Sequence, residues 1–384
     1  MRPSPDVLVI GGGVIGLSLA WAARRAGAAV ALCDPHCGQG ASWAAAGMIA
    51  PVTEAHFGEE ALLSLNLRSA QAWPQFAADL AAATGRQLAY QAEGTLAVAH
   101  DSGDRHVLLE LQKFHQELGL DSHWLTPDAC RQAEPLLAAS IRGGLFAKSD
   151  HQIDPRRLVG ALVQACESGG VEIIAEAACE LVCKGERAVG ARLSSGRSVG
   201  AGRTVLAAGW QSGGLEGLPA FARPPVRPVK GQILRLRLPG RYPAPQHTVR
   251  AVSQGSSIYV VVRPDGEIVC GATVEEMGAD TSVTGGGIYA LLRDAQLVFP
   301  VLLEANFVEA VAGLRPGSPD NAPMLGSSGL EGLLVATGHY RNGILLAPVT
   351  ASLLAGLAAA ADPTPELPDW AKSFDARRFA AAAA

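Results

Sequence analysis

The chain has 384 residues, of which 48% are hydrophobic and 17% are charged. This length is enough for two or three domains with buried cores, and the composition is that of an ordinary globular protein. The formal net charge of −5 gives no basic surface, which argues against nucleic acid as a partner.

The distribution of residues disfavours two further classes of protein. Residues 7–23 are apolar enough to suggest a signal or membrane segment, but a run of three glycines interrupts them, and no other stretch approaches about 18 uninterrupted apolar residues. The seven cysteines are odd in number and lack His or acidic neighbours at metal-ligand spacing. We therefore expect free, buried thiols in a reducing, cytoplasmic compartment, with no metal and no membrane partner.

The glycine turn near the N-terminus is the first motif in chain order. Residues 7–10 predict a short buried strand, and residues 14–26 predict a helix. Between them, Gly11, Gly13 and Gly16 have the Gly-x-Gly-x-x-Gly spacing of the dinucleotide-binding fingerprint. The first glycine permits the turn, the second lets the backbone approach a pyrophosphate, and the third lets the helix pack closely on the strand. A glycine-rich turn without a ligand is the alternative.

A second predicted strand, over residues 29–33, ends in Asp34. In the fingerprint, an acidic residue about 20 positions after the last glycine binds the ribose hydroxyls, so Asp34 is the candidate for that role. Small residues from 41 to 47 follow. They would let the backbone lie close to a flat ligand, or they would pack the tight start of a helix, and the sequence alone leaves both interpretations open.

Helical and strand-like patterns alternate along the rest of the chain. A helix over 155–168 and a strand over 171–174 form a second helix–strand unit of the nucleotide-binding kind. A strand over 333–337 and a helix over 344–361 return the chain to the same sheet near the C-terminus. The other predicted elements are helices over 59–83 and 105–119 and from residue 127, and strands over 88–91, 94–99, 188–193, 198–199, 204–210, 232–238, 258–263 and 268–273.

These elements predict an α/β fold with two domains. The first is a Rossmann-like nucleotide-binding domain with a doubly wound parallel sheet, built from residues 1–87, 150–222 and 311–384. The second is an antiparallel-sheet α+β domain, built from residues 88–149 and 223–310, and we expect it to bind the substrate.

Six stretches, spread over nearly the whole chain, resemble the amino-acid oxidase branch of the FAD-dependent oxidoreductases. Within that branch the chain is most similar to the glycine oxidases of thiamine biosynthesis. The first stretch is shared with many flavin and nicotinamide enzymes, whereas the sequences G-L-R-P-G and G-H-Y-R-N-G near the C-terminus are much more particular. The six stretches are residues 9–16, 41–51, 226–231, 259–273, 313–317 and 338–348.

The resemblance implies FAD, bound noncovalently, as the cofactor. Sarcosine-type enzymes often attach their flavin through a cysteine, and residues 311–345 contain none. Cys179 stands where the family usually has a valine whose backbone lies against the adenine, so the thiol should matter little. The resemblance places the cofactor-binding residues at Gly11, Gly13, Val14, Ile15, Gly16, Asp34, Pro35, Ala41, Ser42, Ala46, Gly47, Met48, Cys179, His339, Tyr340, Arg341, Asn342, Gly343, Ile344 and Leu345.

The resemblance also implies where the substrate binds. Arg315 would clamp the substrate carboxylate with a two-pronged guanidinium, and Tyr259 would add its hydroxyl. Arg341 and Met48 would lie close by. From the residues alone, Arg315 would be a solvated arginine in a turn, and Tyr259 would be a half-buried tyrosine in a sheet.

The implied reaction is oxidation of the C–N bond of an α-amino acid, with hydride transfer to the flavin and reoxidation by dioxygen to give hydrogen peroxide. We expect glycine as the substrate, with sarcosine and small D-amino acids as further candidates, and imino acid or glyoxylate and ammonia as products. The role would be to supply thiazole synthesis in thiamine biosynthesis, and the resembling enzymes suggest a homotetramer. We find no His–acid pair, so no catalytic residue is assigned and substrate orientation is expected to carry the catalysis.

Other functions remain open from the sequence. A D-amino acid dehydrogenase or a sarcosine-type oxidase belongs to the same superfamily, and a quinone-linked enzyme would release no peroxide. An NAD enzyme is disfavoured by the contact region at 41–48 and the C-terminal return of the sheet, which an extended FAD would need. A non-enzymatic nucleotide-binding accessory protein is the remaining alternative. Val274, where the family often has a bulky residue, leaves the pocket width open, and the glycine run at 285–287 is unusual for that loop.

Overall fold

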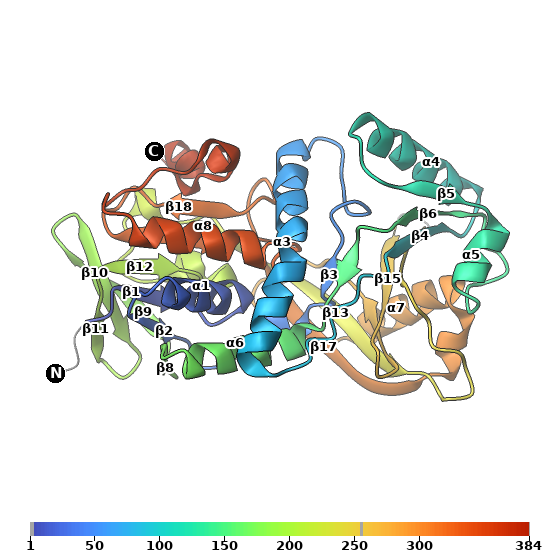
Figure 1. The fold of residues 1–384 in the computed structure, drawn as a ribbon, viewed down its shortest axis with the longest axis horizontal. Coiled ribbons are helices and arrows are strands. Elements are labelled where there is room, and N and C mark those ends of the chain that lie inside the picture. The colour runs from blue at the N-terminus through green and yellow to red at the C-terminus, as the bar shows by residue number, and fades with distance from the viewer. Residues whose placement is uncertain (1–3, 254–255, 384) are drawn as a thin grey trace.

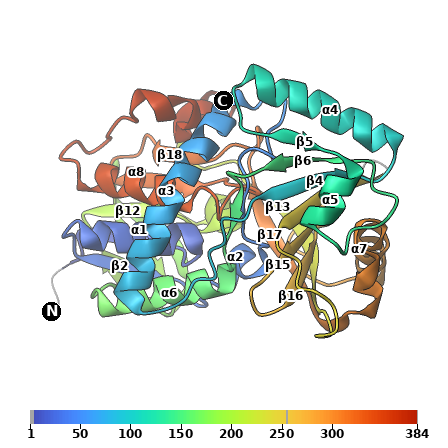
Figure 2. The same ribbon diagram turned by 45° about the vertical axis from the view of Figure 1, so that its right-hand side comes forward.

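The computed structural model describes residues 4–253 and 256–383. Two large β-sheets lie side by side, each with its own hydrophobic core, and helix α3 (Glu60–Thr84) crosses the helical side of the first of them (Figures 1 and 2). None of the described helices combines the length and the apolar character that crossing a bilayer requires. The residue boundaries given above for the two domains stay a prediction.

The first sheet has six strands in the order β18-β19-β12-β1-β2-β8. All neighbouring pairs run parallel except the edge pair β18 and β19, which is antiparallel. The second helix–strand unit and the C-terminal return of the chain both join this sheet, which confirms that part of the prediction. The strands are β1 (Val7–Ile10), β2 (Val30–Cys33), β8 (Glu172–Ile174), β12 (Arg203–Leu206), β18 (Met324–Ser327) and β19 (Leu333–Thr337).

Successive side chains of β1 point to opposite faces of this sheet, so their contacts show what covers each face. Val7 and Val9 belong to the core beneath four helices, whereas Leu8 and Ile10 pack against a small sheet of order β11-β10-β9. Helices therefore cover one face and an antiparallel sheet covers the other. The covering elements are α1 (Val14–Arg25), α3, α6 (Pro155–Ser168) and α8 (Ala347–Ala359) on one side, and β9 (Ala178–Lys184), β10 (Arg187–Leu193) and β11 (Ser198–Gly200) on the other.

The second sheet has eight strands in the order β17-β13-β16-β15-β14-β4-β6-β5, antiparallel except for the pair β14 and β4. Helix α7 packs on one face through Leu291 and Val298, and the other face presents Ile233 and Val261 toward Ala46. Ala46 belongs to the part of the molecule built around the first sheet, called the first half below, and the part built around the second sheet is called the second half. The predicted fold class, a mixed α/β fold with a parallel sheet and a separate antiparallel sheet, is confirmed. The strands are β4 (Thr95–Ala99), β5 (His123–Leu125), β6 (Gly144–Ala147), β13 (Arg227–Arg237), β14 (Thr248–Ser253), β15 (Ser256–Val262), β16 (Glu267–Gly271) and β17 (Asn306–Gly317), and the helices are α4 (Ser102–Glu117), α5 (Pro127–Ala133) and α7 (Gly285–Val298).

Short elements complete the chain. Strand β3 (Met48–Ile49) pairs with β7 (His151–Gln152) where the two halves meet, and α2 (Ala41–Ala44) packs against β17. The predicted strand over 88–91 is wrong, because Ala89 has a left-handed backbone with a φ of 52° and only Gln91 forms a bridge. The 3-10 helices are Gly209–Gly214, Ala220–Ala222, Pro300–Glu304, Asp369–Phe374 and Ala376–Ala383.

The glycine run at 285–287 is the first turn of α7 and not a loop. The Thr284 hydroxyl accepts the N–H of Gly287 at 3.1 Å and caps the helix. A Cβ at Gly287 would lie 2.6 Å from the amide carbon of the Gln232 side chain, so a larger residue there would displace that amide, whereas Gly285 and Gly286 face open space. This helix was missed because glycine has a low helix propensity.

Two further details differ from the sequence-based expectations. The last helix begins at Ala347 and not at residue 344, because residues 343–346 form a turn before it. All seven cysteines are free, as predicted, but burial is incomplete: Cys179 is exposed and Cys37 and Cys183 are partly buried.

Candidate active site

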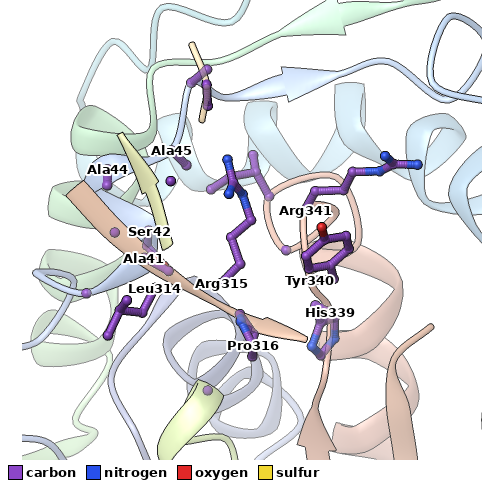
Figure 3. Close-up of a pocket in the computed structure, with 18 of the residues that line it drawn as sticks. Ala41, Ser42, Ala44, Ala45, Leu314, Arg315, Pro316, His339, Tyr340 and Arg341 are labelled. Atoms are coloured by element: carbon purple, nitrogen blue, oxygen red, sulfur yellow. The ribbon is translucent and has the colours of Figure 1, made fainter. Parts of the chain in front are cut away.

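A cavity of about 820 Å³ lies between the two sheets, and both halves contribute side chains to it. This volume is in the range of cofactor and ligand pockets. Figure 3 shows Arg315 between the segment 41–45 and residues 339–341, with all three regions lining the same cavity. The cavity extends from the glycine turn after β1 to the strands β13 and β17.

The glycine turn is shaped as a cradle at one end of the cavity. Gly11 has a φ of +107°, and a Cβ there would lie 2.7 Å from the carbonyl carbon of Ala207. A Cβ at Gly16 would overlap the carbonyl oxygen of Gly11. Only glycine fits both positions, so the start of α1 can offer its N–H groups to an anion at close range. This geometry fits the pyrophosphate of a dinucleotide.

Asp34 lies at the carboxyl end of β2 and lines the cavity. Its Oδ2 accepts the N–H of Gly12 at 2.7 Å, and its Oδ1 accepts the N–H of His36 at 2.7 Å. The hydroxyl of Ser42 accepts the N–H of Val14 at 3.0 Å and links α2 to the first turn of α1. The backbone thus orients the Asp34 carboxylate beside the glycine turn, and its contact with a ribose stays a prediction.

The small residues at 41–47 span the short helix α2 and the extended segment that follows it, and most of them also line the cavity. Gly47 has a φ of +84°, and a Cβ there would lie 2.8 Å from Cγ of Pro155. This segment therefore passes between the cavity and the start of α6, where a larger residue at position 47 would not fit.

The second half holds this segment in place through Arg263, which is buried and follows β15. Its guanidinium donates to the side-chain oxygen of Gln152 at 3.0 Å and to the carbonyl of Ile153 at 2.9 Å, and it also donates to the carbonyl of Ala46. Burial lowers the pKa of Arg263 to about 10, so the guanidinium remains charged at neutral pH.

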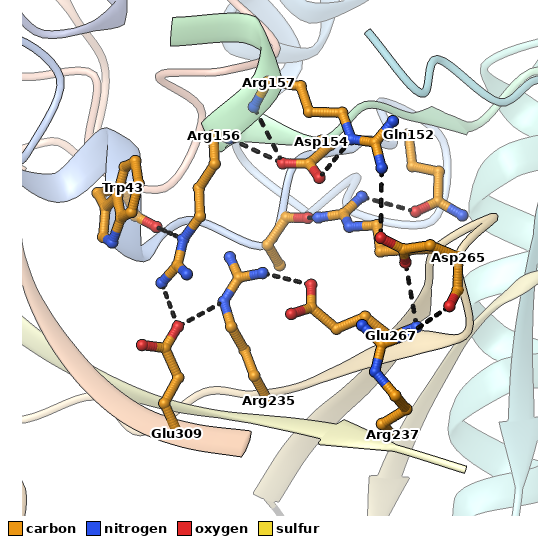
Figure 4. Close-up of polar contacts among 12 residues, drawn as sticks. Trp43, Gln152, Asp154, Arg156, Arg157, Arg235, Arg237, Asp265, Glu267 and Glu309 are labelled. Atoms are coloured by element: carbon orange, nitrogen blue, oxygen red, sulfur yellow. Dashed lines mark hydrogen bonds and ion pairs between the residues drawn. The ribbon is translucent and has the colours of Figure 1, made fainter. Parts of the chain in front are cut away.

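Ion pairs between charged side chains form a second connection between the halves (Figure 4). Arg156 lies 4.3 Å from the ring centroid of Trp43 and pairs with Glu309 of β17. Glu309 also lies 3.3 Å from Nε of Arg235, which pairs with Glu267 at 2.5 Å. Because Arg235 is almost completely buried, its charge depends on Glu267 and Glu309 for compensation, whereas Glu309 itself is partly exposed.

The segment after β19 forms another wall of the cavity. His339 is buried, and its Nε2 lies 3.1 Å from the hydroxyl of Thr350. Burial lowers the pKa of His339 to about 3, so the imidazole is neutral at physiological pH. The carbonyl of Leu345 accepts hydrogen bonds from the Ser69 hydroxyl at 2.6 Å and the Trp73 indole at 2.9 Å, and helix α3 thereby fixes the turn before α8.

The substrate end of the cavity is built on two glycines in neighbouring strands. The guanidinium of Arg315 lies over Gly231, where a Cβ would lie 2.5 Å from its Cζ. The ring of Tyr259 lies over Gly271, where a Cβ would lie 2.5 Å from its Cζ. Because Gly231 is in β13 and Gly271 is in the adjacent β16, the two side chains meet on the same face of the sheet.

Within the described part of the chain, Arg315 has hydrogen bonds only to backbone carbonyls, those of Thr273 at 3.1 Å and Lys230 at 3.4 Å. Among the described residues no carboxylate pairs with it. Burial raises the pKa of Tyr259 to about 12, so its hydroxyl remains a hydrogen-bond donor at neutral pH. The site thus offers a cation and a neutral hydroxyl, without a carboxylate of its own beside the cation.

The other predicted substrate residues lie at the same end. Arg341 lines the cavity with its Nη2 3.6 Å from Glu59, and Met48 lines it from β3. Val274 lies on the rim with 66% of its surface exposed, so the position is open on that side.

Most of the residues predicted to bind the cofactor line this single cavity, and their contacts with it stay predictions. Five lie outside the lining: Gly16 packs beneath the turn, Cys179 is exposed on β9, and the others are Pro35, Asn342 and Leu345.

Several lining residues were missed by the sequence analysis. Residues 207–211 follow β12 at the carboxyl edge of the parallel sheet, and the general rule that ligands bind at this edge would have found them. Glu54 and Arg250 also line the cavity, and no local pattern marks them. Gly271, inside the strand predicted over 268–273, was a usable signal, because glycine inside a strand often marks close approach of another group. Gly231 preceded the strand predicted over 232–238, and only the longer β13 places it inside a strand.

A glycine cradle at the edge of a parallel sheet, continuous with Arg315, for which the described residues offer no carboxylate partner, defines a dinucleotide-binding protein whose ligand cavity is completed by a second sheet. The family model DAO, described as FAD dependent oxidoreductase, matches residues 6–357. The chain therefore belongs to this family, and FAD is its cofactor.

The most similar relatives agree with this assignment. The bifunctional protein ThiO/ThiG of Trichormus variabilis is 37% identical over 352 residues, which cover 91% of this chain and 52% of that protein. The glycine oxidase of Geobacillus kaustophilus is 32% identical over 358 residues and 92% of each chain. The crystal structure of glycine oxidase from Geobacillus kaustophilus superimposes with a TM-score of 0.87 at 30% identity, covering 97% of this chain and 98% of that one. The chain spans about half the length of the first curated relatives it matches.

Proposed function

We propose that the protein oxidises glycine with dioxygen and water to glyoxylate, ammonia and hydrogen peroxide, and that sarcosine and small D-amino acids are further substrates. One observation carries the proposal: the Arg315 guanidinium, free of any described carboxylate, lies beside the Tyr259 hydroxyl in a cavity continuous with the dinucleotide cradle. The names of the relatives, glycine oxidase and ThiO/ThiG, support the substrate and a role in thiazole synthesis for thiamine biosynthesis.

The chain's own residues bind and orient the substrate. Arg315 and Tyr259 hold the carboxylate, with the guanidinium supplying two parallel hydrogen bonds. FAD, held by the glycine turn, the segment at 41–48 and the segment at 339–345, supplies the acceptor for the hydride of the α-carbon. His339 is neutral and bonded to Thr350, so it neither donates a proton to the substrate nor adds charge to the wall. Orientation of the α-carbon is then the main contribution of the protein.

The remaining parts of the proposal follow the predictions above. The cofactor is bound noncovalently by the predicted residues, and Arg341 and Met48 complete the substrate site. The two domains have the predicted boundaries, and the protein is a cytoplasmic homotetramer without nucleic-acid or membrane partners.

The test is a substrate panel on the purified yellow protein, with peroxide release measured in air and flavin bleaching measured under nitrogen. Glycine should bleach the flavin and release peroxide. Bleaching without peroxide would instead indicate a quinone-linked dehydrogenase, and a flavin that no amine bleaches would refute amine oxidation.

The variant Arg315→Ala separates substrate binding from cofactor binding. We expect a severe rise in KM for glycine with the flavin absorption retained, because the variant removes the carboxylate anchor and leaves the glycine cradle intact. Arg241→Ala is the matched control, since Arg241 forms an exposed pair with Glu304 at 3.3 Å outside the cavity. Unchanged kinetics in Arg315→Ala would defeat the assignment.

A further inference from the structure

An ion pair that the reaction does not use lies in the wall of the cavity. Nη1 of Arg250 is 2.6 Å from Oε1 of Glu54, and both side chains are more than four-fifths buried. Arg250 comes from β14 in the second half, whereas Glu54 follows β3 in the first half. Both residues line the same cavity as Arg315.

The register of the sheet places this pair beside the predicted substrate anchors. Arg250 is directly opposite Tyr259 in the β14–β15 pair, and Tyr259 is opposite Gly271 in the β15–β16 pair. Side chains directly opposite each other on antiparallel strands share one face, with Cβ atoms about 5 Å apart. Two guanidinium groups, those of Arg315 and Arg250, therefore flank the Tyr259 ring.

The two arginines differ in their partners. Among the described residues Arg315 is hydrogen-bonded to carbonyls and paired with no carboxylate, so its charge is available to a carboxylate ligand. Arg250 is neutralised by Glu54, and a second anion near it would meet the Glu54 carboxylate at short range. In a site shielded from water, such a like-charge contact is costly.

We propose that Glu54 is a specificity-determining residue, which masks Arg250 and so restricts the cavity to amines that carry a single carboxylate. Amines with a second carboxylate, on the nitrogen or on the α-carbon side chain, are excluded because the second cation next to Tyr259 is already paired. This inference rests on the proposed function, since it concerns which amine reaches the oxidation site.

The experiment removes the negative charge that neutralises Arg250 and keeps the shape of the Glu54 side chain. Glu54→Gln leaves the Arg250 guanidinium unpaired, so the ratio of kcat/KM for iminodiacetate or D-aspartate to that for glycine should rise about tenfold or more, as expected for one new charge-assisted pair. The double variant Glu54→Gln/Arg250→Met should lose this gain. Glu304→Gln, which removes an exposed acid outside the cavity, is the matched control and should leave the ratio unchanged.

Ligand binding gives a readout that does not depend on turnover. The dissociation constants of glycolate and malonate, followed through the flavin spectrum, should show about tenfold tighter binding of malonate to Glu54→Gln and a clearly smaller gain for glycolate, which has no second carboxylate to reach Arg250. Arg250→Met serves as the second variant, in case Glu54→Gln loses its flavin. It leaves Glu54 as an unpaired anion near Tyr259 and should weaken glycolate binding about tenfold.

The outcomes separate the two proposals. The role of the pair would be overturned if Glu54→Gln folds and binds flavin but keeps the wild-type ratio of kcat/KM for iminodiacetate or D-aspartate to that for glycine. It would also be overturned if this ratio rises and the rise persists in the double variant. Unchanged glycolate binding in Arg250→Met would do the same. A wild-type flavin that no amine bleaches would defeat the proposed function, while the glycolate and malonate measurements would still decide whether Glu54 masks Arg250.

Discussion

The position of the Arg315 guanidinium over Gly231 can be tested without removing its charge. Gly231→Ala would place a Cβ 2.5 Å from Cζ of Arg315, well inside van der Waals contact, so the guanidinium has to move away from the sheet. Gly231 does not have a left-handed backbone, so alanine adds no backbone strain. A hydrogen-bonded contact to a charged group contributes about 1.5–3 kcal/mol, which corresponds to a roughly 10- to 150-fold loss in kcat/KM for glycine.

The assay is steady-state peroxide release together with the flavin spectrum of Gly231→Ala. We expect the loss to appear mainly in KM and the flavin to stay bound, because Gly231 is remote from the glycine turn. Gly286→Ala is the matched control, since a Cβ there meets nothing within 4 Å. If Gly231→Ala binds and oxidises glycine as the wild type does, the carboxylate is not held by Arg315 in this position, and the reasoning is refuted.

Two further predictions concern pH and the junction between the halves. His339 has a folded pKa of about 3 against 6.5 for the free side chain, so the unfolded state gains a proton below pH 6.5 and stability falls as the pH drops toward 3. When the pH falls from 7 to 5, the free energy of unfolding measured with urea should decrease by about 2 kcal/mol less for His339→Gln than for the wild type. An equal loss in both proteins would contradict the buried, neutral imidazole. Arg263→Met leaves the Gln152 and Ile153 oxygens unpaired, and we expect unfolding to become about 3 kcal/mol easier and FAD to dissociate faster, as read by flavin fluorescence. An Arg263→Met protein as stable and as flavin-tight as Arg241→Met would contradict this role.

The glycine turn could be predicted from the sequence because its requirements are local. Gly11 and Gly16 are needed by contacts within one strand–turn–helix unit, and their spacing is visible in the chain. Helix α7 was missed for a local reason as well, since its first turn contains three glycines and its cap, Thr284, was not recognised. The strand predicted at 88–91 failed because the backbone at Ala89 is left-handed, which its hydrophobic pattern does not reveal.

The pairs that hold the cavity together are separated by long stretches of chain. Arg263 contacts the carbonyl of Ala46, and Arg250 pairs with Glu54, although in each case about half of the chain lies between the partners. No periodicity or spacing rule connects such residues, because their contact depends on how one sheet docks on the other. The resemblance to a family identified Arg315 and Tyr259 as substrate residues. It did not identify Arg263, which fixes the segment at Ala46, or Glu54, which neutralises Arg250.

The substrate end follows from sheet register, and this explains why its side chains can serve a small ligand. Arg250, Tyr259, Gly271 and Ile233 form one row across four adjacent strands. Because the row contains a glycine, and Gly231 is two residues from Ile233 on the same face, the Tyr259 ring and the Arg315 guanidinium lie flat on the sheet. The space above them stays open and continuous with the cradle at the glycine turn. A side chain at Gly231 or Gly271 would push Arg315 or Tyr259 into that space, so the two glycines form the floor of the pocket. The Glu54–Arg250 pair lies in the wall beside them and makes that part of the wall neutral overall.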